Sequence, residues 1–125
     1  MKQAIFSASA PAAIGPYSQA ITVGDTVYIS GQLPIDPATG SFPSDDVRDQ
    51  TRMSLENIRA ILAAAGLTMA NVVKTTVLLD DIGDFGAMNE VYGAYFAEPY
   101  PARAAFEVAK LPKGAKVEIE VVAVR

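Results

Sequence analysis

The sequence predicts an α+β fold in which two helices cover one face of a mixed β-sheet. Short β-branched and aromatic runs, typical of strands, alternate with two longer segments whose apolar residues recur at helical spacing. Glycine and proline divide the chain into short elements. Half of the residues are hydrophobic and 19% are charged, as in a chain that folds around a core. With 125 residues, we expect a single domain, residues 1–125.

The N-terminal elements are expected to be strands. Residues 20–23 and 26–30 are rich in β-branched and aromatic side chains. The dipeptide Gly24-Asp25 between them is typical of a two-residue hairpin turn. A further short strand is expected near Ile5.

A long amphipathic helix is expected next. Ser44 is its expected N-cap, because a serine hydroxyl can accept a hydrogen bond from a free amide of the first turn. Gly66 suits the left-handed conformation that ends many helices. Between these two residues, the positions at helical spacing that form the buried face are Val47, Thr51, Leu55, Ile58, Ile61, Leu62 and Ala65.

The second half of the chain predicts a central strand, a helix and two further strands. Residues 72–79 are apolar on both faces apart from one lysine and the threonines, as in a buried strand. The second helix is expected to begin near Asp84 and to stop before Pro99. Residues 103–109 and 116–124 are expected to form a hairpin closed near residues 111–114, which gives the element order ββαβαββ.

Alternation along the last two strands predicts which face the helices cover. The apolar sets are Ala104, Phe106 and Val108 on one strand and Val117, Ile119 and Val121 on the other. The remaining face is expected to carry Tyr28, Ser30, Arg103, Glu118 and Glu120. Either water or another copy of the chain covers this second face, and alternation does not decide between them.

The composition excludes several kinds of chemistry. The chain has no cysteine and no histidine, so it has no disulfide, thiolate nucleophile, serine–histidine triad or ordinary zinc-hydrolase centre. The net charge of −4, the pI near 4.6 and the lack of a basic run disfavour nucleic-acid binding. No apolar run approaches the roughly 20 residues that span a bilayer, and the first residues do not resemble a secretory signal. We expect a cytoplasmic protein that does not bind membranes.

An arginine and a carboxylate are the strongest candidates for chemistry. The predicted hairpin places Arg103 opposite residues 118–122, beside Glu118 or Glu120. An exposed cross-strand ion pair is one explanation, worth about 0.2–1 kcal/mol. The functional alternative is that the guanidinium grips a substrate carboxylate while the glutamate takes a proton from water.

Three further segments have both a structural and a functional interpretation. Gly15-Pro16-Tyr17-Ser18 is a turn from which a tyrosine hydroxyl could enter a cleft. Ser30-Gly31 ends a strand with a hydroxyl and an unhindered amide that suit an anion. Asn89 lies on the second predicted helix, where a solvated or capping role is the plainer explanation.

These segments resemble one family in order along nearly the whole chain. They are Gly15-Pro16-Tyr17-Ser18-Gln19-Ala20, Ser30-Gly31-Gln32-Leu33-Pro34, Val73-Lys74-Thr75-Thr76-Val77, Pro101-Ala102-Arg103-Ala104, Leu111-Pro112-Lys113-Gly114 and Val117-Glu118-Ile119-Glu120. The sequence is similar to the RidA family of reactive-intermediate deaminases, also called YjgF-type proteins. The C-terminal motifs are the specific part of the resemblance.

The resemblance implies a chorismate-mutase-like α+β fold and a homotrimer with a barrel-like centre and clefts between subunits. It implies hydrolysis of 2-imino acids and their enamine tautomers, such as 2-iminobutanoate and 2-iminopropanoate, to 2-keto acids and ammonia. No cofactor and no metal are expected. The partners are then a small imino-acid substrate and two further copies of the chain.

The resemblance also implies roles for individual residues. Arg103 would bind the substrate carboxylate, Glu118 would position and activate water, and Tyr17 would contact the substrate. The expected lining of the same cleft comprises Ser30, Gly31, Ala105 and Asn89. Ala105 stands where many relatives have cysteine, so only a backbone role is retained there and thiol-dependent regulation is put in doubt.

Two other functions remain as alternatives. One is a regulatory trimer whose clefts bind small carboxylates without turnover, for which Arg103 would matter and Glu118 would not. The other is endoribonuclease activity, which the acidic pI and the absence of histidine disfavour.

Overall fold

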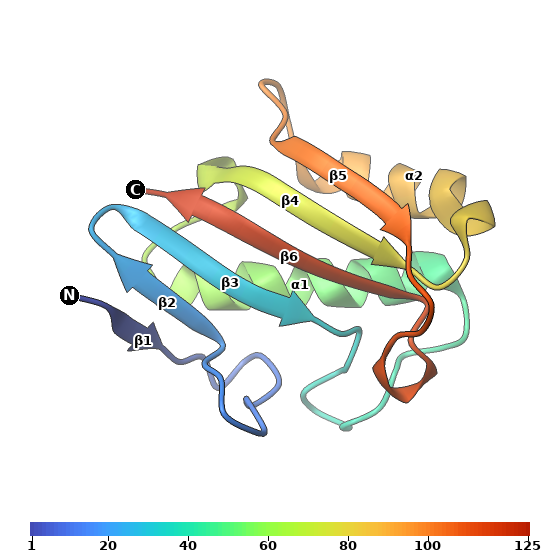
Figure 1. The fold of residues 1–125 in the computed structure, drawn as a ribbon, viewed down its shortest axis with the longest axis horizontal. Helices are drawn as coiled ribbons and strands as arrows, with labels where there is room; N and C mark the ends of the chain where they lie inside the picture. The colour runs from blue at the N-terminus through green and yellow to red at the C-terminus, as the bar shows by residue number, and fades with distance from the viewer.

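A computed structural model describes all 125 residues and shows the expected α+β fold (Figure 1). Two helices lie side by side on one face of a six-stranded mixed sheet with strand order β1-β2-β3-β6-β4-β5. The elements are β1 (Gln3–Ile5), β2 (Ala20–Val23), β3 (Thr26–Gln32), α1 (Val47–Ala64), β4 (Val72–Leu79), α2 (Phe85–Tyr95), β5 (Ala102–Glu107) and β6 (Val117–Val124). No helix has the length and apolarity needed to cross a bilayer.

The predicted N-terminal hairpin is confirmed. β2 and β3 pair antiparallel with Val23 opposite Thr26, so Gly24-Asp25 forms the two-residue turn. Gly24 has a φ of 56°, a left-handed value that glycine adopts without strain. β3 runs two residues further than predicted, and its pairing with β6 shifts register between Ile29 and Gln32. This irregularity falls at Ser30 and Gly31, two of the expected site residues.

The first helix is confirmed, but its N-cap is Asp46 rather than Ser44. The Asp46 carboxylate accepts a hydrogen bond of 2.8 Å from the Arg48 amide. The Ser44 hydroxyl accepts from the Asp46 amide at 3.0 Å, and Ser44 thus lies two residues before the N-cap. The helix ends at Ala64, and Gly66 has the predicted left-handed backbone, with a φ of 76°.

The core lies between α1, α2 and the sheet. Side chains with no exposed surface come from α1 (Leu55, Ile58, Ile61 and Leu62), α2 (Met88) and the strands (Val27, Val77, Leu79, Val117 and Ile119). Each large apolar side chain buried in this way contributes roughly 1.5–3 kcal/mol. The predicted alternation of β6 is confirmed, because Val117, Ile119 and Val121 are buried on the helix side.

The predicted hairpin between β5 and β6 is wrong. β5 pairs with β4 in parallel, and β6 lies between β3 and β4. Arg103 is therefore the register partner of Thr75, and Thr75 is in turn opposite Val121. The strands β4 and β5 are joined through α2, the connection that parallel strands require. The segment after β5 anchors Leu111 and Ala115 in the core instead of forming a tight turn.

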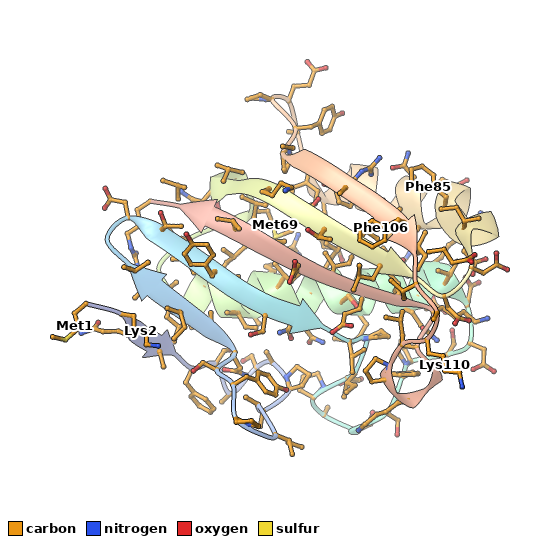
Figure 2. The ribbon with its side chains drawn as sticks, viewed as in Figure 1. Met1, Lys2, Met69, Phe85, Phe106 and Lys110 are labelled. Carbon is orange, nitrogen blue, oxygen red and sulfur yellow. The ribbon has the colours of Figure 1, made fainter.

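The predicted faces of β5 are also wrong. Because laterally paired residues point to the same side of a sheet, Arg103 shares the helix side with buried Thr75. Ala105 packs against the core on that side, whereas Phe106 lies on the open face and is 46% exposed (Figure 2). β5 is an edge strand rich in alanine, so its sequence has little hydrophobic contrast between its two faces.

Helix α2 is joined to α1 by a polar contact as well as by the core. The Tyr95 hydroxyl donates a 2.5 Å hydrogen bond to Oε2 of Glu56, and the Arg59 guanidinium lies 4.9 Å from the centre of the tyrosine ring. Burial and the bonded Glu56 carboxylate raise the pKa of Tyr95 to about 12. α2 ends at Tyr95, four residues before the proline that was expected to stop it.

Candidate active site

Glu118 lies on the open face of the sheet, packed against the backbone of β3. A side-chain carbon at position 31 would lie 2.5 Å from its Oε2 atom, so any residue larger than glycine would force the carboxylate to move. Burial raises the pKa of the Glu118 carboxyl, and the neighbouring Glu120 carboxylate raises it further. Glu118 is thus a half-buried base that packs against the Gly31 backbone of β3.

Tyr17, Ser30 and Gly31 lie around the same carboxylate. Together with Glu118 they line a pocket of about 670 Å³ on the open face. The Ser30 hydroxyl donates a 2.6 Å hydrogen bond to the Ser18 carbonyl, and this bond ties the turn that carries Tyr17 to β3. The Tyr17 ring is 54% exposed. These four residues are brought together as the sequence motifs imply.

Sequence reasoning missed Gln19, which anchors the loop beside this pocket. Its buried side-chain amide accepts from the Ser7 amide at 2.8 Å and donates to the Pro11 carbonyl at 2.8 Å. A glutamine inside the Gly-Pro-Tyr-Ser-Gln motif was the available signal, since a buried amide needs several partners.

Arg103 and Asn89 form a second group at the other side of the sheet. Nη1 of Arg103 donates a 2.7 Å hydrogen bond to Oδ1 of Asn89 on α2. The guanidinium carbon lies 4.7 Å from the ring centre of Tyr92 and 5.3 Å from that of Phe85. A pocket of about 450 Å³ opens beside them, lined by Asn89, Tyr92, Gly93, Tyr100, Pro101 and Arg103.

Phe85 and Tyr92 are also residues that the sequence did not assign to the site. Both lie at helical spacing with the other apolar residues of α2, which is typical of the buried face of a helix. Tyr92 is indeed 5% exposed, yet one face of its ring supports the arginine. Nothing in the sequence separates these two roles.

The two groups do not meet within one chain. Arg103 points to the helix side of the sheet, Glu118 points to the open side, and their pockets share no residue. The ion pairs of the structure are Arg48–Glu90, Arg52–Asp49 and Arg59–Glu56, so Arg103 pairs with no carboxylate. The predicted contact of Arg103 with Glu118 or Glu120, as an ion pair or as a catalytic pair within one chain, is wrong.

The comparisons with known proteins agree on one family. Residues 7–125 match the family described as Endoribonuclease L-PSP. The Homo sapiens protein named 2-iminobutanoate/2-iminopropanoate deaminase is 52% identical over 125 residues, which cover 100% of this chain and 91% of that protein. A RutC family protein of Pyrococcus horikoshii is 55% identical over 98% of each chain. The solved structure of E. coli TdcF with bound serine is 48% identical, covers 98% of each chain and has a TM-score of 0.93.

These matches extend over nearly the whole chain rather than over one motif. The two relatives are 52% and 55% identical to this chain over the aligned residues, and the solved structure has the same fold over 98% of the chain. The chain therefore belongs to the RidA family, as its motifs indicate.

Proposed function

We propose that this protein hydrolyses 2-imino acids and their enamine tautomers, such as 2-iminobutanoate and 2-iminopropanoate, to 2-keto acids and ammonia. The observation that carries the proposal is that the Arg103 guanidinium pairs with no carboxylate. Its contacts are the amide of Asn89 and two aromatic rings, which leave its positive charge unneutralised. Such a group suits a substrate carboxylate. Relatives with 52–55% identity bear the name of this deaminase.

We further propose that the working unit is a homotrimer with clefts between subunits. Because Arg103 and Glu118 lie on opposite sides of the sheet, one chain cannot bring both to a single substrate. An Arg103 group from one copy and a Glu118 group from the next can form a complete site. The open face also exposes Tyr28, Phe106 and Val124 by 51%, 46% and 37%, which favours its burial in a barrel-like centre.

In the proposed mechanism, Arg103 binds the carboxylate of the imino acid and presents the imine carbon to a water molecule. Glu118 of the neighbouring copy accepts a proton as the water oxygen attacks that carbon, and it returns the proton to the nitrogen. In the resulting carbinolamine, Glu118 takes the hydroxyl proton and passes it to the nitrogen. The C–N bond then breaks as the C=O bond forms, and ammonia leaves. The raised pKa of Glu118 makes it a stronger base, and such assistance contributes roughly 10²–10⁴-fold.

The other site residues have supporting roles in this proposal. Tyr17 contacts the substrate through its hydroxyl, while Ser30 and Gly31 line the cleft beside Glu118. Asn89 holds Arg103, and the backbone carbonyl of Ala105, on the free edge strand, helps to orient the water.

The test is the release of keto acid and ammonia from an imine generated in situ. We expect the purified protein to accelerate release, Arg103→Ala to lose nearly all of that acceleration and Glu118→Gln to lose most of it. Arg125→Ala is a suitable control, because Arg125 donates to the Ala65 carbonyl far from either pocket. Near-normal rates in both site variants would reject the assignments.

A carboxylate-binding protein without turnover is the second candidate, and the solved relative with bound serine favours considering it. In that case Arg103→Ala would lose affinity for 2-ketobutyrate, whereas Glu118→Gln would bind normally and the wild type would release no keto acid. Titration of 2-ketobutyrate beside the turnover assay separates the two functions.

The name of the matched family also calls for an RNA-cleavage control. The arginines of α1, Arg48, Arg52 and Arg59, are each paired with a carboxylate, so this helix offers no free basic stripe to a phosphate backbone. We expect that any RNA cleavage either is lost on repurification or persists unchanged in Arg103→Ala.

A further inference from the structure

We propose that Phe85 and Tyr92 of α2 are positioning residues that hold the guanidinium of Arg103 in the plane required to bind a carboxylate. The inference rests on the proposed function, since it concerns how the substrate-binding arginine is prepared. It assigns a role to two more residues, and neither of them lines the pocket beside Glu118.

The first argument is geometric. Phe85, Asn89 and Tyr92 are spaced four and three residues apart on α2, so their side chains follow one stripe of the helix. Arg103 reaches this stripe from β5, with its guanidinium carbon 5.3 Å and 4.7 Å from the two ring centres and Nη1 bonded to Asn89 at 2.7 Å. Two rings and one acceptor restrict both the position and the tilt of the planar group.

The second argument is that the Tyr92 ring is itself fixed. Its hydroxyl shares a buried 2.8 Å hydrogen bond with Oγ1 of Thr75, and Thr75 is the register partner of Arg103 on the neighbouring strand. The ring also packs against Phe96, with the ring centres 4.7 Å apart. A ring held at its edge and on its face gives the arginine a rigid support.

The third argument concerns charge. A carboxylate would hold the guanidinium more strongly than these contacts, but it would also occupy the donors and neutralise the charge that the substrate needs. The groups that contact Arg103 are instead two aromatic rings and a neutral amide. Nε and Nη2 make no hydrogen bond within the chain, so the edge of the guanidinium suited to bidentate binding is free.

The experiment compares Phe85→Leu, Tyr92→Leu and Tyr92→Phe with a matched control, Tyr95→Leu. The control removes an equivalent arginine–tyrosine stack from the same helix, because Arg59 lies 4.9 Å from the Tyr95 ring. Three experiments are done on each protein. Calorimetric titration gives the affinity for 2-ketobutyrate, imine hydrolysis gives KM and kcat, and NMR gives the Arg103 Nε–Hε resonance, assigned with Arg103→Lys.

We expect Phe85→Leu and Tyr92→Leu to weaken 2-ketobutyrate binding and raise KM by about 3- to 10-fold each, the range of a cation–π contact, with kcat within about twofold of wild type. The Arg103 resonance should lose the shift that two nearby rings impose. Tyr92→Phe keeps the ring and should retain most of the affinity, and Tyr95→Leu should change neither the affinity nor the Arg103 resonance. If Tyr92→Leu does not fold, Phe85→Leu and Tyr92→Phe decide the question.

Unchanged affinity and an unchanged Arg103 resonance in Phe85→Leu would overturn the proposal, as would equal losses in the Tyr95→Leu control. A wild-type protein that binds no 2-ketobutyrate would also overturn it. A protein that binds 2-ketobutyrate, loses affinity in the variants and yet releases no keto acid from imines would reject the proposed hydrolysis alone.

Discussion

Glu118 has a carboxyl pKa that burial and a second acid both raise, and this has a measurable consequence for the proposed reaction. A general base works only when it is ionised, so keto-acid release should increase as the pH rises through the raised pKa of Glu118. Glu120→Gln removes the neighbouring negative charge, which lowers the pKa of Glu118 and should move the acid side of the pH–rate curve to lower pH.

The pH dependence is measured as kcat/KM for imine hydrolysis, with the uncatalysed rate subtracted at each pH. Glu107→Gln is the control, because Glu107 accepts from the Ile82 amide away from the pocket. An acid limb that stays at the same pH in Glu120→Gln would show that another group titrates.

Gly31 determines whether the Glu118 carboxylate can occupy its place. Because a side-chain carbon at position 31 would lie 2.5 Å from Oε2 and 3.0 Å from the carboxyl carbon, Gly31→Ala should displace the carboxylate. We expect a loss of about 10-fold or more in kcat, in keeping with general-base assistance of roughly 10²–10⁴-fold. In a Glu118→Gln background the same substitution should cause little further loss, and a full additional loss would contradict the steric role.

Substitution of Asn89 tests whether substrate binding depends on the unneutralised positive charge of Arg103. Asn89→Asp keeps the shape of the side chain but places a carboxylate 2.7 Å from the guanidinium, where it competes with a substrate carboxylate. The affinity for 2-ketobutyrate should fall by about 10-fold or more, because charge-assisted hydrogen bonds are roughly twice as strong as neutral ones. Titration of wild type, Asn89→Asp and Asn89→Ala measures this, and equal affinities for wild type and Asn89→Asp would reject the charge argument.

At the scale of single residues, the sequence predicts which residues gather around Glu118 better than it predicts the surroundings of Arg103. Tyr17, Ser30, Gly31 and Glu118 lie together because the motifs that carry them sit on paired strands and the adjoining turn. The support of Arg103 by Phe85 and Tyr92 could not be predicted, because a ring that is buried on one face and stacked on the other has the same periodicity as an ordinary core residue.

At the scale of elements, the end of α1 offers a direct test of backbone conformation. Gly66 has a φ of 76° with open space around it, so Gly66→Ala introduces strain and no clash. We expect a loss of about 1 kcal/mol in the free energy of unfolding. Gly86 also has open space but lies within α2 without a positive φ, so Gly86→Ala should stabilise the protein by about 0.4–1 kcal/mol. Urea unfolding of both variants checks the opposite signs.

β5 is the element whose pairing the sequence predicts wrongly. A run from residue 103 to 124 interrupted by a Pro-Lys-Gly turn is typical of a hairpin, and local signals favour that pairing. The pattern that argues otherwise is the nearly continuous apolar run of β4, which is typical of a strand in a parallel pair. β5 is its parallel neighbour, and this pairing turns the Arg103 side chain to the helix side of the sheet.

At the scale of the whole molecule, the fold separates the two chemical groups by the thickness of the sheet. β5 is an edge strand whose outer backbone groups have no partner in the chain, and the open face exposes apolar side chains. Both features fit an assembly in which a second copy covers what the first leaves exposed. The sequence predicts such a cover only through its resemblance to the family, because alternation alone does not decide between water and another copy.

The proposed trimer, with sites shared between copies, predicts that two inactive variants can restore activity to each other. Arg103→Ala still supplies Glu118, and Glu118→Gln still supplies Arg103, so a mixed oligomer contains some clefts with both native groups. In randomly mixed trimers with equal amounts of each variant, about one quarter of the clefts are complete, and keto-acid release should reach about one quarter of the wild-type rate. The variants are unfolded together, refolded and compared with each one refolded alone.

Complementation depends on the geometry of the sheet rather than on the details of the chemistry. If each chain contained a complete site, no mixture could place a native arginine and a native glutamate in one cleft, and the mixed sample would remain as inactive as its components. The molar mass of the refolded mixture, measured by light scattering, should be about three times the 13.2 kDa of the chain. A monomeric mass would exclude shared clefts outright, because Arg103 and Glu118 of one chain face away from each other.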